Sequence, residues 1–464
     1  MTGKGMQESR SLKSLTAIGL AALAVVAILF ALARPAAAPA ATFPTGYNPS
    51  GYPTSGCFWT GGFTRSNPVT NIAFPGTEIT YWAARFVTPP GSTLTLKGAF
   101  PYARYSSLNS YKAEGASQSS LTDRNIKPDP GSINPSIPGA NRRATNRSYT
   151  VTVRGEAPPA TPVQNTLFAE PVEGQYQTIV YRVYVPDRGK NLSGGTALPQ
   201  PTLRLADGRE LTGQALCDEM NSVHLFDTQE LPLASYQALV NSPGKNPATN
   251  PAENPIQFSR YYNTLNALAR YQTVDQQQAA WKANPNYVGT QYDNNDARYM
   301  TGAYSFDFGK VVVLKGKLPT TPRTLAGQKK MTSGQLILWD MCIIQSLVTT
   351  KTWDCVFDEQ LPLRGGNKRQ YTIVISSKAN RPKNATKACG VWWMQADPDG
   401  DGAGRKSIGQ LLTRNVLPAS NYRQSSWSVP SPFPADAAKA MGAYYPKGSY
   451  TSKKRFERTG CHKG

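Results

Sequence analysis

Two stretches of the sequence, LTLKGAFP at residues 94–101 and VVLKGKLP at residues 312–319, resemble each other. Three more pairs of stretches follow in the same order: YTVTV (149–153) with YTIVI (371–375), NTLFA (165–169) with NATKA (384–388), and IVYRVYVP (179–186) with LLTRNVLP (411–418). Self-similarity in a constant order is the sequence signature of a repeated structural unit. We therefore predict two related halves, the alternative being a chance echo of ordinary strand and turn composition.

Each copy consists of short runs that are apolar or alternate between apolar and polar, bounded by Gly, Pro, Asn and Asp, a pattern typical of strands joined by turns. The 39 glycines and 37 prolines among 464 residues argue against a helical bundle. We predict a mainly β fold of two repeated antiparallel β-sandwich halves, jelly-roll-like, with a helical or irregular segment between them. The predicted boundaries are a signal peptide or N-terminal anchor at 1–41, a first half at 42–210, a connecting segment at 211–299, a second half at 300–446, and a basic tail at 447–464.

The N-terminal region predicts export. Residues 15–33 carry no charge and follow a short segment with Lys4, Arg10 and Lys13. At 1.5 Å per residue this apolar run spans about 28 Å, close to the hydrocarbon thickness of a bilayer. It therefore predicts either an uncleaved membrane anchor or a signal cleaved after Ala40. In both cases the rest of the chain lies outside the membrane, anchored facing outward or secreted and retained in the cell envelope.

The six cysteines predict three disulfide bonds, because an even number in an exported chain reads as a disulfide framework. Cys342 and Cys355 are placed symmetrically about a polar turn near residues 349–351, so an antiparallel hairpin would set them opposite each other. The other four cysteines allow three pairings. We favour Cys57–Cys217 and Cys389–Cys461, since each pair closes one half. A zinc site is the alternative, but the sequence contains no Cys-x-x-Cys pair.

The charge of the chain indicates anionic partners. The formal net charge is +21, and since residues 1–40 hold four basic residues and one acidic residue, +18 stays on the exported part. Outside the membrane the abundant anions are lipid headgroups and acidic envelope polymers rather than nucleic acid. We predict these as partners, with a protein partner as a further candidate. Residues 447–464 would serve as an electrostatic tether or simply as a solvated tail.

Tyrosine and arginine clusters are the predicted ligand-binding residues. Alternate positions of a strand share one face, so such a cluster could form a polar aromatic surface that stacks on sugars or lipid headgroups. The alternative is that these are ordinary core and rim tyrosines. The candidates are Tyr102, Arg104, Tyr105, Asn109, Tyr111, Arg182 and Tyr184.

Three aspartates suggest a weak calcium site, and no other cofactor is expected. Asp397, Asp399 and Asp401 supply oxygen ligands at alternate positions, as in the first half of a calcium loop. The twelfth position of that loop is Ile408 rather than a bidentate glutamate. A solvated acidic loop is the alternative.

Five stretches carry a resemblance to known proteins: PYARYSSLNSYK (101–112), NRSYTVTV (146–153), VYRVYVPDRG (180–189), VVVLKGKLPTTPRT (311–324) and YTIVISSKANRPKNA (371–385). The chain resembles, from about Trp59 to Pro418, a family of exported, uncharacterised actinobacterial and proteobacterial proteins. More distantly, its strand and turn pattern is similar to a bacterial β-sandwich domain of unknown function. The resemblance implies a fold and a compartment, and no activity.

The leading functional interpretation is a disulfide-stabilised envelope protein, more a binding protein than an enzyme, whose partner is a glycan, a lipid or a protein at the cell surface. Only two histidines occur in the chain, which argues against Ser-His-Asp and Cys-His catalysis. The alternative is an exported carbohydrate-active enzyme that uses a carboxylate pair. Its candidate carboxylates are Asp129, Asp187, Asp358 and Glu359.

Overall fold

The computed structural model describes residues 52–112, 115–171, 176–224, 230–283 and 292–461. The apolar stretch at residues 15–33, predicted as a signal or anchor, lies outside the described residues. Among the residues described, no helix has both the length and the apolar character needed to cross a bilayer.

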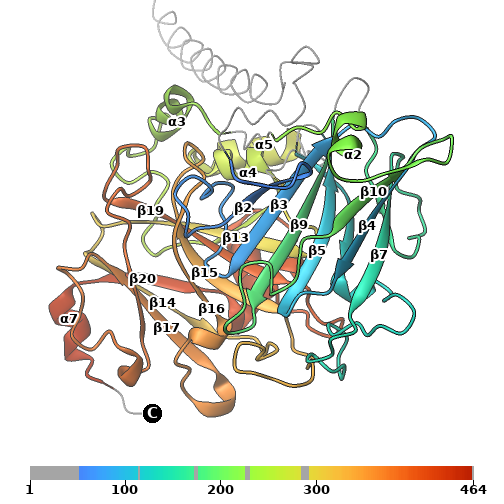
Figure 1. Cartoon of the computed structure of the whole chain (residues 1–464). Helices are drawn as coiled ribbons and strands as arrows, with labels where there is room; N and C mark the ends of the chain where they lie inside the picture. The colour runs from blue at the N-terminus through green and yellow to red at the C-terminus, as the bar shows by residue number, and fades with distance from the viewer. Residues whose placement is uncertain (1–51, 113–114, 172–175, 225–229, 284–291, 462–464) are drawn as a thin grey trace, which may run out of the picture.

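The first sandwich is built from the N-terminal strands, which pair into two sheets facing each other (Figure 1). Its larger sheet has the order β1-β2-β3-β9-β5-β6 and its smaller sheet the order β11-β10-β4-β7-β8. Leu96, Val151 and Ile179 belong to the fully buried core between the sheets. The strands are β1 (Thr54–Ser55), β2 (Trp59–Phe63), β3 (Ile79–Phe86), β4 (Thr93–Ala99), β5 (Ala103–Tyr111), β6 (Ser117–Thr122), β7 (Ser148–Arg154), β8 (Thr166–Phe168), β9 (Gln177–Pro186), β10 (Gln200–Arg204) and β11 (Glu210–Leu211).

The second sandwich has a larger sheet of order β12-β13-β19-β15-β16 and a smaller sheet of order β18-β17-β14-β20. Its core includes Leu314, Trp339 and Leu411. The strands are β12 (Ser259–Tyr261), β13 (Ala297–Ser305), β14 (Val311–Lys317), β15 (Leu338–Ile344), β16 (Thr352–Phe357), β17 (Gln370–Ser376), β18 (Trp392–Gln395), β19 (Ile408–Val416) and β20 (Lys447–Thr451).

The two sandwiches repeat one topology. The order β2-β3-β9-β5-β6 returns as β12-β13-β19-β15-β16, and the order β10-β4-β7-β8 returns as β20-β14-β17-β18. In both copies the last strand of the smaller sheet, β8 or β18, pairs in parallel with its neighbour. The predicted mainly β fold with two repeated sandwich halves is therefore confirmed.

The shared Lys-Gly and Tyr-Thr motifs have a packing explanation. Gly98 pairs with Tyr149 across β4 and β7, and Gly316 pairs with Tyr371 across β14 and β17. A Cβ atom would lie 2.7 Å from the Tyr149 hydroxyl oxygen at Gly98, and 2.6 Å from the Tyr371 hydroxyl oxygen at Gly316. The tyrosine ring covers its cross-strand glycine in both copies, so only glycine leaves room for it.

One of the four repeat landmarks is wrong. NTLFA contains β8, whereas NATKA ends in the short 3-10 helix η4 (Lys387–Cys389) that precedes β18. The ladders instead make Leu167, the partner of Val153, equivalent to Met394, the partner of Ile375. The register of an edge strand is decided by its pairing, which a similarity of composition in the preceding loop does not reveal.

Four helices lie in the described part of the segment that connects the sandwiches: α2 (Gly213–Glu219), α3 (Leu233–Val240), α4 (Thr264–Ala269) and α5 (Val274–Ala283). This segment also contains β12 and the start of β13, so part of it belongs to the second sandwich. Helix α6 (Pro434–Met441) precedes β20. The remaining 3-10 turns are η1 (Asp123–Asn125), η2 (Asp358–Gln360), η3 (Gly366–Lys368), η5 (Ser426–Ser428) and η6 (Gly442–Tyr444).

The segment predicted as a basic tail is part of the fold. Residues 447–451 form β20, an edge strand that pairs with β14, and α7 (Lys453–Arg458) follows it. Phe456 of α7 is buried against the outer face of the smaller sheet. The strand and the helix each contain one aromatic residue, Tyr450 and Phe456, and the many basic side chains around them concealed both elements.

The three predicted disulfides are all present: Cys57–Cys217, Cys342–Cys355 and Cys389–Cys461. Cys342 and Cys355 are direct cross-strand partners in the β15–β16 hairpin. The other two bonds each tie the end of one sandwich to an earlier segment of the same sandwich. No cysteine is free.

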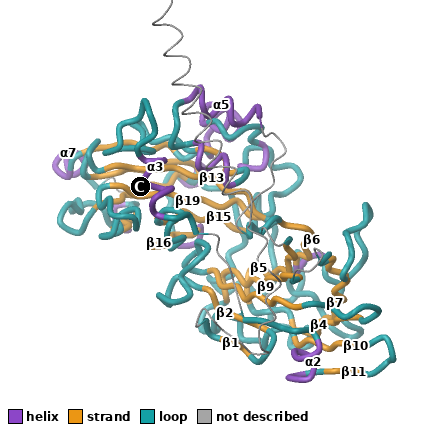
Figure 2. The backbone as a smooth tube through the Cα atoms, turned by 90° about the horizontal axis from the view of Figure 1, so that it is seen from above, coloured by secondary structure: helices purple, strands orange, loops and turns teal. Residues whose placement is uncertain are grey.

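The sandwiches pack against each other through their larger sheets, and Figure 2 shows them side by side. A shared cluster of buried apolar residues joins Tyr105, Val180 and Tyr184 of the first sandwich to Leu338 and Val416 of the second. The outward faces of the two equivalent sheets thus become an internal junction.

Candidate functional site

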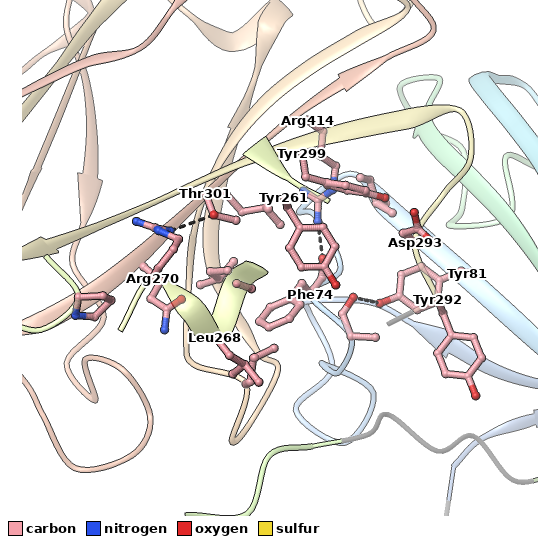
Figure 3. A pocket seen from close by; sticks show the side chains of 18 of the residues that line it. Phe74, Tyr81, Tyr261, Leu268, Arg270, Tyr292, Asp293, Tyr299, Thr301 and Arg414 are labelled. Atoms are coloured by element: carbon pink, nitrogen blue, oxygen red, sulfur yellow. Dashed lines mark hydrogen bonds between the residues drawn. The ribbon is translucent and has the colours of Figure 1, made fainter. Parts of the chain in front are cut away.

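Equivalent residues of the two sandwiches meet at this junction. Tyr81 pairs with Arg182 across β3 and β9, and Tyr299 pairs with Arg414 across β13 and β19. All four line one pocket with a volume of about 120 Å³, which we call the central pocket (Figure 3). Another wall comes from Leu268 of helix α4 and from Arg270, the residue after that helix.

The walls of the central pocket are mainly aromatic. Figure 3 shows the Tyr261 ring in the middle of the site, between Phe74 and the pair of Tyr299 and Arg414. Burial raises the pKa of Tyr81 and of Tyr299, so both hydroxyls stay protonated at neutral pH. The aromatic lining residues are Phe74, Tyr81, Tyr184, Tyr236, Tyr261, Tyr271, Tyr292 and Tyr299.

The two equivalent arginines differ in how their charge is balanced. Arg414 donates from Nη1 to Oδ2 of Asp340 at 2.7 Å, and its backbone N–H donates to Oδ1 of the same carboxylate. Arg182 donates to the Asn109 side-chain oxygen and to the Tyr292 carbonyl, both at 2.7 Å, and forms no ion pair with any described residue. The reason is that Ser107 pairs with Arg182 where Asp340 pairs with Arg414. A nearly buried cation is therefore left without a bonded carboxylate.

Polar groups stand at opposite sides of the central pocket. On one side Arg270 donates to the Thr301 hydroxyl at 2.9 Å, and burial lowers the pKa of this guanidinium. On the other side the Oδ1 atom of Asp293 is buried and has no hydrogen-bond partner among the described residues. The pocket thus offers cationic donors and an unused carboxylate acceptor across an aromatic floor.

The structure brings two of the predicted ligand residues, Arg182 and Tyr184, into the central pocket. Tyr105, Asn109 and Tyr111 lie behind it in the junction. The Tyr105 hydroxyl donates to Asp296 at 2.9 Å, and the Tyr111 hydroxyl donates to the Asp293 carbonyl at 2.8 Å. The face of β5 that we expected to be exposed is covered because the second sandwich packs on it.

The other two candidates lie elsewhere. Tyr102 stacks beneath the Arg147 guanidinium, whose central carbon is 3.5 Å from the ring centroid. Arg104 crosses the junction and places Nη1 at 2.8 Å from both oxygens of Asp358, while Nη2 binds Glu359. Tyr102 and Arg104 thus make contacts within the fold rather than with the central pocket.

Several pocket residues were missed by the sequence analysis, among them Tyr81, Tyr261, Arg270, Asp293, Tyr299 and Arg414. One signal was available: IVYRVYVP and LLTRNVLP align Arg182 with Arg414, so a ligand residue in one copy pointed to its counterpart in the other. No sequence pattern indicated that the two copies face each other.

The three calcium candidates do not converge on a metal site. Asp397 accepts from the Gln345 side chain at 2.8 Å, Asp401 accepts from Arg405 Nε at 2.7 Å, and Asp399 is exposed. No group of three or more His, Cys, Asp or Glu side chains suited to a metal occurs in the described part of the chain. Arg405 provides the positive charge at Asp401 that a calcium ion would otherwise supply.

The carboxylates considered for a glycosidase pair do not line the central pocket either. Asp358 and Glu359 bind Arg104, and Asp187 binds Arg142. Asp129 lies in a turn, where its backbone N–H donates to the Ser148 carbonyl at 3.0 Å.

Comparison with known proteins gives distant structural similarity only. No family model and no curated protein matches the chain. A solved structure of an uncharacterized protein from Burkholderia cenocepacia is similar over 87% of this chain and 84% of that one, with 11% identity and a TM-score of 0.45. The VPA0106 protein from Vibrio parahaemolyticus is similar over 82% of this chain and 90% of that one, with 9% identity and a TM-score of 0.37. Neither similarity supports an inference about ligand or activity.

Proposed function

We propose that the chain is a non-catalytic binding protein of the cell envelope whose central pocket takes an acidic sugar unit. The observation that carries the proposal is Arg182, a nearly buried cation without a bonded carboxylate in a tyrosine-lined pocket. The three disulfides support an oxidising compartment outside the cytoplasm.

The pocket chemistry matches the three kinds of surface that an acidic sugar presents. Tyrosine rings such as Tyr261 offer flat apolar faces with a polar edge, which suit the C–H face of a sugar ring. A guanidinium binds a carboxylate through two parallel hydrogen bonds, a role open to Arg182 or Arg270. The unused Oδ1 atom of Asp293 would accept a hydrogen bond from a sugar hydroxyl.

The same composition favours binding over hydrolysis. A glycosidase of the usual kind needs two carboxyl groups about 5 to 10 Å apart on either side of the bond that it cleaves. Asp293 is the single carboxylate among the described residues that line the central pocket. A volume of about 120 Å³ lies below the roughly 300 to 1,000 Å³ of ordinary ligand pockets, so it leaves no room for a bound chain with several subsites.

The proposal is tested by calorimetric titration of the full-length chain in detergent with glucuronate and with glucose. Glucuronate should bind at least tenfold more tightly, because only it carries the carboxylate. Arg182→Gln and Arg270→Gln should each remove most of this preference, with folding of the variants checked by near-ultraviolet circular dichroism. Arg204→Gln, at an exposed position of β10, is the matched control and should bind as the parent chain does.

Equal affinity for the two sugars would contradict the proposal, as would a preference that survives both pocket substitutions. Release of reducing sugar from acidic oligosaccharides would instead favour the alternative of an exported carbohydrate-active enzyme.

A further inference from the structure

A second concave surface lies on the other side of the second sandwich. It is a groove of about 410 Å³ between the outer face of the smaller sheet, helix α7 and the Cys389–Cys461 disulfide region. Four basic side chains line it. They are Lys315 of β14, Lys447 of β20, Arg455 of α7, and Arg364 of the loop before β17. We call it the outer groove.

The two lysines of the outer groove are direct cross-strand partners. Lys315 stands opposite Lys447 in the β14–β20 ladder, and both side chains are exposed. They share the outer face, because Val311 and Val313 pack beneath Phe456 on that face while Leu314 points into the sandwich core. Like charges directly opposite each other destabilise a sheet, so this pair costs stability in the absence of a counter-charge.

No described residue supplies that counter-charge. The lining of the outer groove contains no aspartate or glutamate, and none of its four cations takes part in an ion pair in the described part of the chain. The nearest acidic residue on α7, Glu457, accepts from the Lys383 backbone N–H instead. Hydroxyl groups of Thr372, Ser449, Thr451 and Thr459 add neutral polar groups to the lining.

Arg364 lies at the opposite wall. Its guanidinium lies so close to Gly390, which has a positive φ of 66°, that a side chain at this glycine would collide with it. Gly390 follows Cys389, one of the two cysteines that tie this wall to the end of α7. The disulfide region therefore lies directly against a guanidinium across from the lysine pair.

The first sandwich has the equivalent strands without a second lysine opposite the first. Its equivalent ladder sets Lys97 opposite Gln200, where the second sandwich has Lys315 opposite Lys447. Lys97 also pairs with Thr150 as Lys315 pairs with Thr372, so the surroundings match on that side. The opposed lysines are therefore not a requirement of the fold.

We propose that the outer groove binds a phosphoryl oxyanion. Four convergent cations suit an oxyanion whose oxygens point in several directions. A tetrahedral phosphoryl group has such oxygens, and a terminal phosphoryl group also carries nearly two negative charges. Arginine binds phosphate through two parallel hydrogen bonds and lysine binds it as a point charge, so the residues present suit this ligand. The inference is independent of the central pocket and of its proposed ligand.

The test uses the full-length chain in detergent, with inorganic pyrophosphate as the probe. Calorimetry measures the affinity for pyrophosphate, and a thermal melt measures the midpoint of unfolding. Lys447→Gln recreates the Lys–Gln pair of the first sandwich. We expect it to weaken pyrophosphate binding at least tenfold and, without pyrophosphate, to raise the thermal midpoint because the repulsion is removed. Lys315→Gln should act in the same way. Lys97→Gln is the matched control and should change neither quantity.

A second titration with glycerophosphoglycerol, the soluble headgroup of an anionic lipid, identifies the source of the phosphoryl group. Binding that depends on Lys447 assigns a phosphodiester such as a lipid headgroup, whereas binding of pyrophosphate alone assigns a free terminal phosphoryl group. The proposal is overturned if the parent chain binds neither probe, or if Lys97→Gln weakens binding as much as Lys447→Gln does.

Discussion

The two sandwiches place an aspartate at the same point of the fold and surround it differently. Asp123 begins η1 and accepts the backbone N–H of Ser106 at 2.8 Å, while Asp358 begins η2 and accepts the backbone N–H of Trp339 at 3.0 Å. Asp358 also binds Arg104. Asp123 accepts from the Ser136 hydroxyl, the charge of the adjacent Arg124 partly offsets its burial, and its Oδ1 atom has no hydrogen-bond partner in the described part of the chain. Both aspartates accept a backbone N–H at the equivalent position of the repeat. The ion pair of Asp358 comes from Arg104 of the other sandwich.

The arginine pair at the junction shows the same division. Arg182 and Arg414 occupy equivalent ladder positions, but only Arg414 has a carboxylate opposite it. The two copies therefore differ in which charged side chains they carry at equivalent backbone positions. The central pocket and the outer groove both contain such positions.

The largest expected effect comes from Arg104→Met, which removes the side chain that joins the sandwiches. Arg104 and Asp358 are fully buried, and the substitution leaves two carboxylates without their cation. Loss of one partner from a buried ion pair typically costs about 3 to 5 kcal/mol of unfolding free energy. Urea denaturation should show this loss. Arg154→Met breaks an exposed pair with Glu156 and should cost less than about 1 kcal/mol. Equal effects would mean that the junction does not depend on Arg104.

The next largest effect concerns the pH dependence of stability at Asp123. Burial raises the pKa of this carboxyl from 3.8 to about 6. The folded chain then holds the proton more tightly than the unfolded chain, so stability is greatest below about pH 4 and falls as the pH rises through about 6. The loss amounts to about 3 kcal/mol at most, since one pKa unit corresponds to about 1.4 kcal/mol.

Asp123→Asn should remove that fall and stabilise the chain at pH 7, because the amide can keep the bond from Ser106 without a buried charge. Asp358→Asn should destabilise the chain at pH 7, since Arg104 loses its main partner. Thermal midpoints measured from pH 4 to pH 8 would reveal both trends, with exposed Asp218→Asn as the control. Identical profiles for the two variants would refute the contrast drawn between these aspartates.

The smallest expected effect tests what the two copies share. Gly98→Ala and Gly316→Ala should each cost about 1 to 3 kcal/mol, because the new methyl group meets Tyr149 or Tyr371 and forces the ring to shift. The two costs should agree, since the geometry repeats. Combining each change with Tyr149→Leu or Tyr371→Leu in a double-mutant cycle should relieve most of the cost. Strictly additive effects would show that the glycines are needed for another reason.

The predictions from the sequence succeeded where neighbours along a strand or a hairpin carry the information. Alternating runs predicted the mainly β fold, and the symmetric spacing of Cys342 and Cys355 predicted their bond. Two of the tyrosine and arginine candidates, Arg182 and Tyr184, line the central pocket, but the burial of the others was not predictable. Whether Tyr105 meets solvent or another sheet depends on residues such as Asn294 and Asp296, which are far from it in the sequence.

By itself the sequence determined the strand content, the repeat and the disulfide framework, because periodicity, turn residues and cysteine spacing act over short distances or recur in order. The tertiary structure decided that the two larger sheets face each other, that Arg182 lacks a carboxylate while Arg414 has one, and that Lys447 lies opposite Lys315. These outcomes depend on the packing of surfaces and on strand register between residues more than seventy positions apart, and no local pattern encodes them.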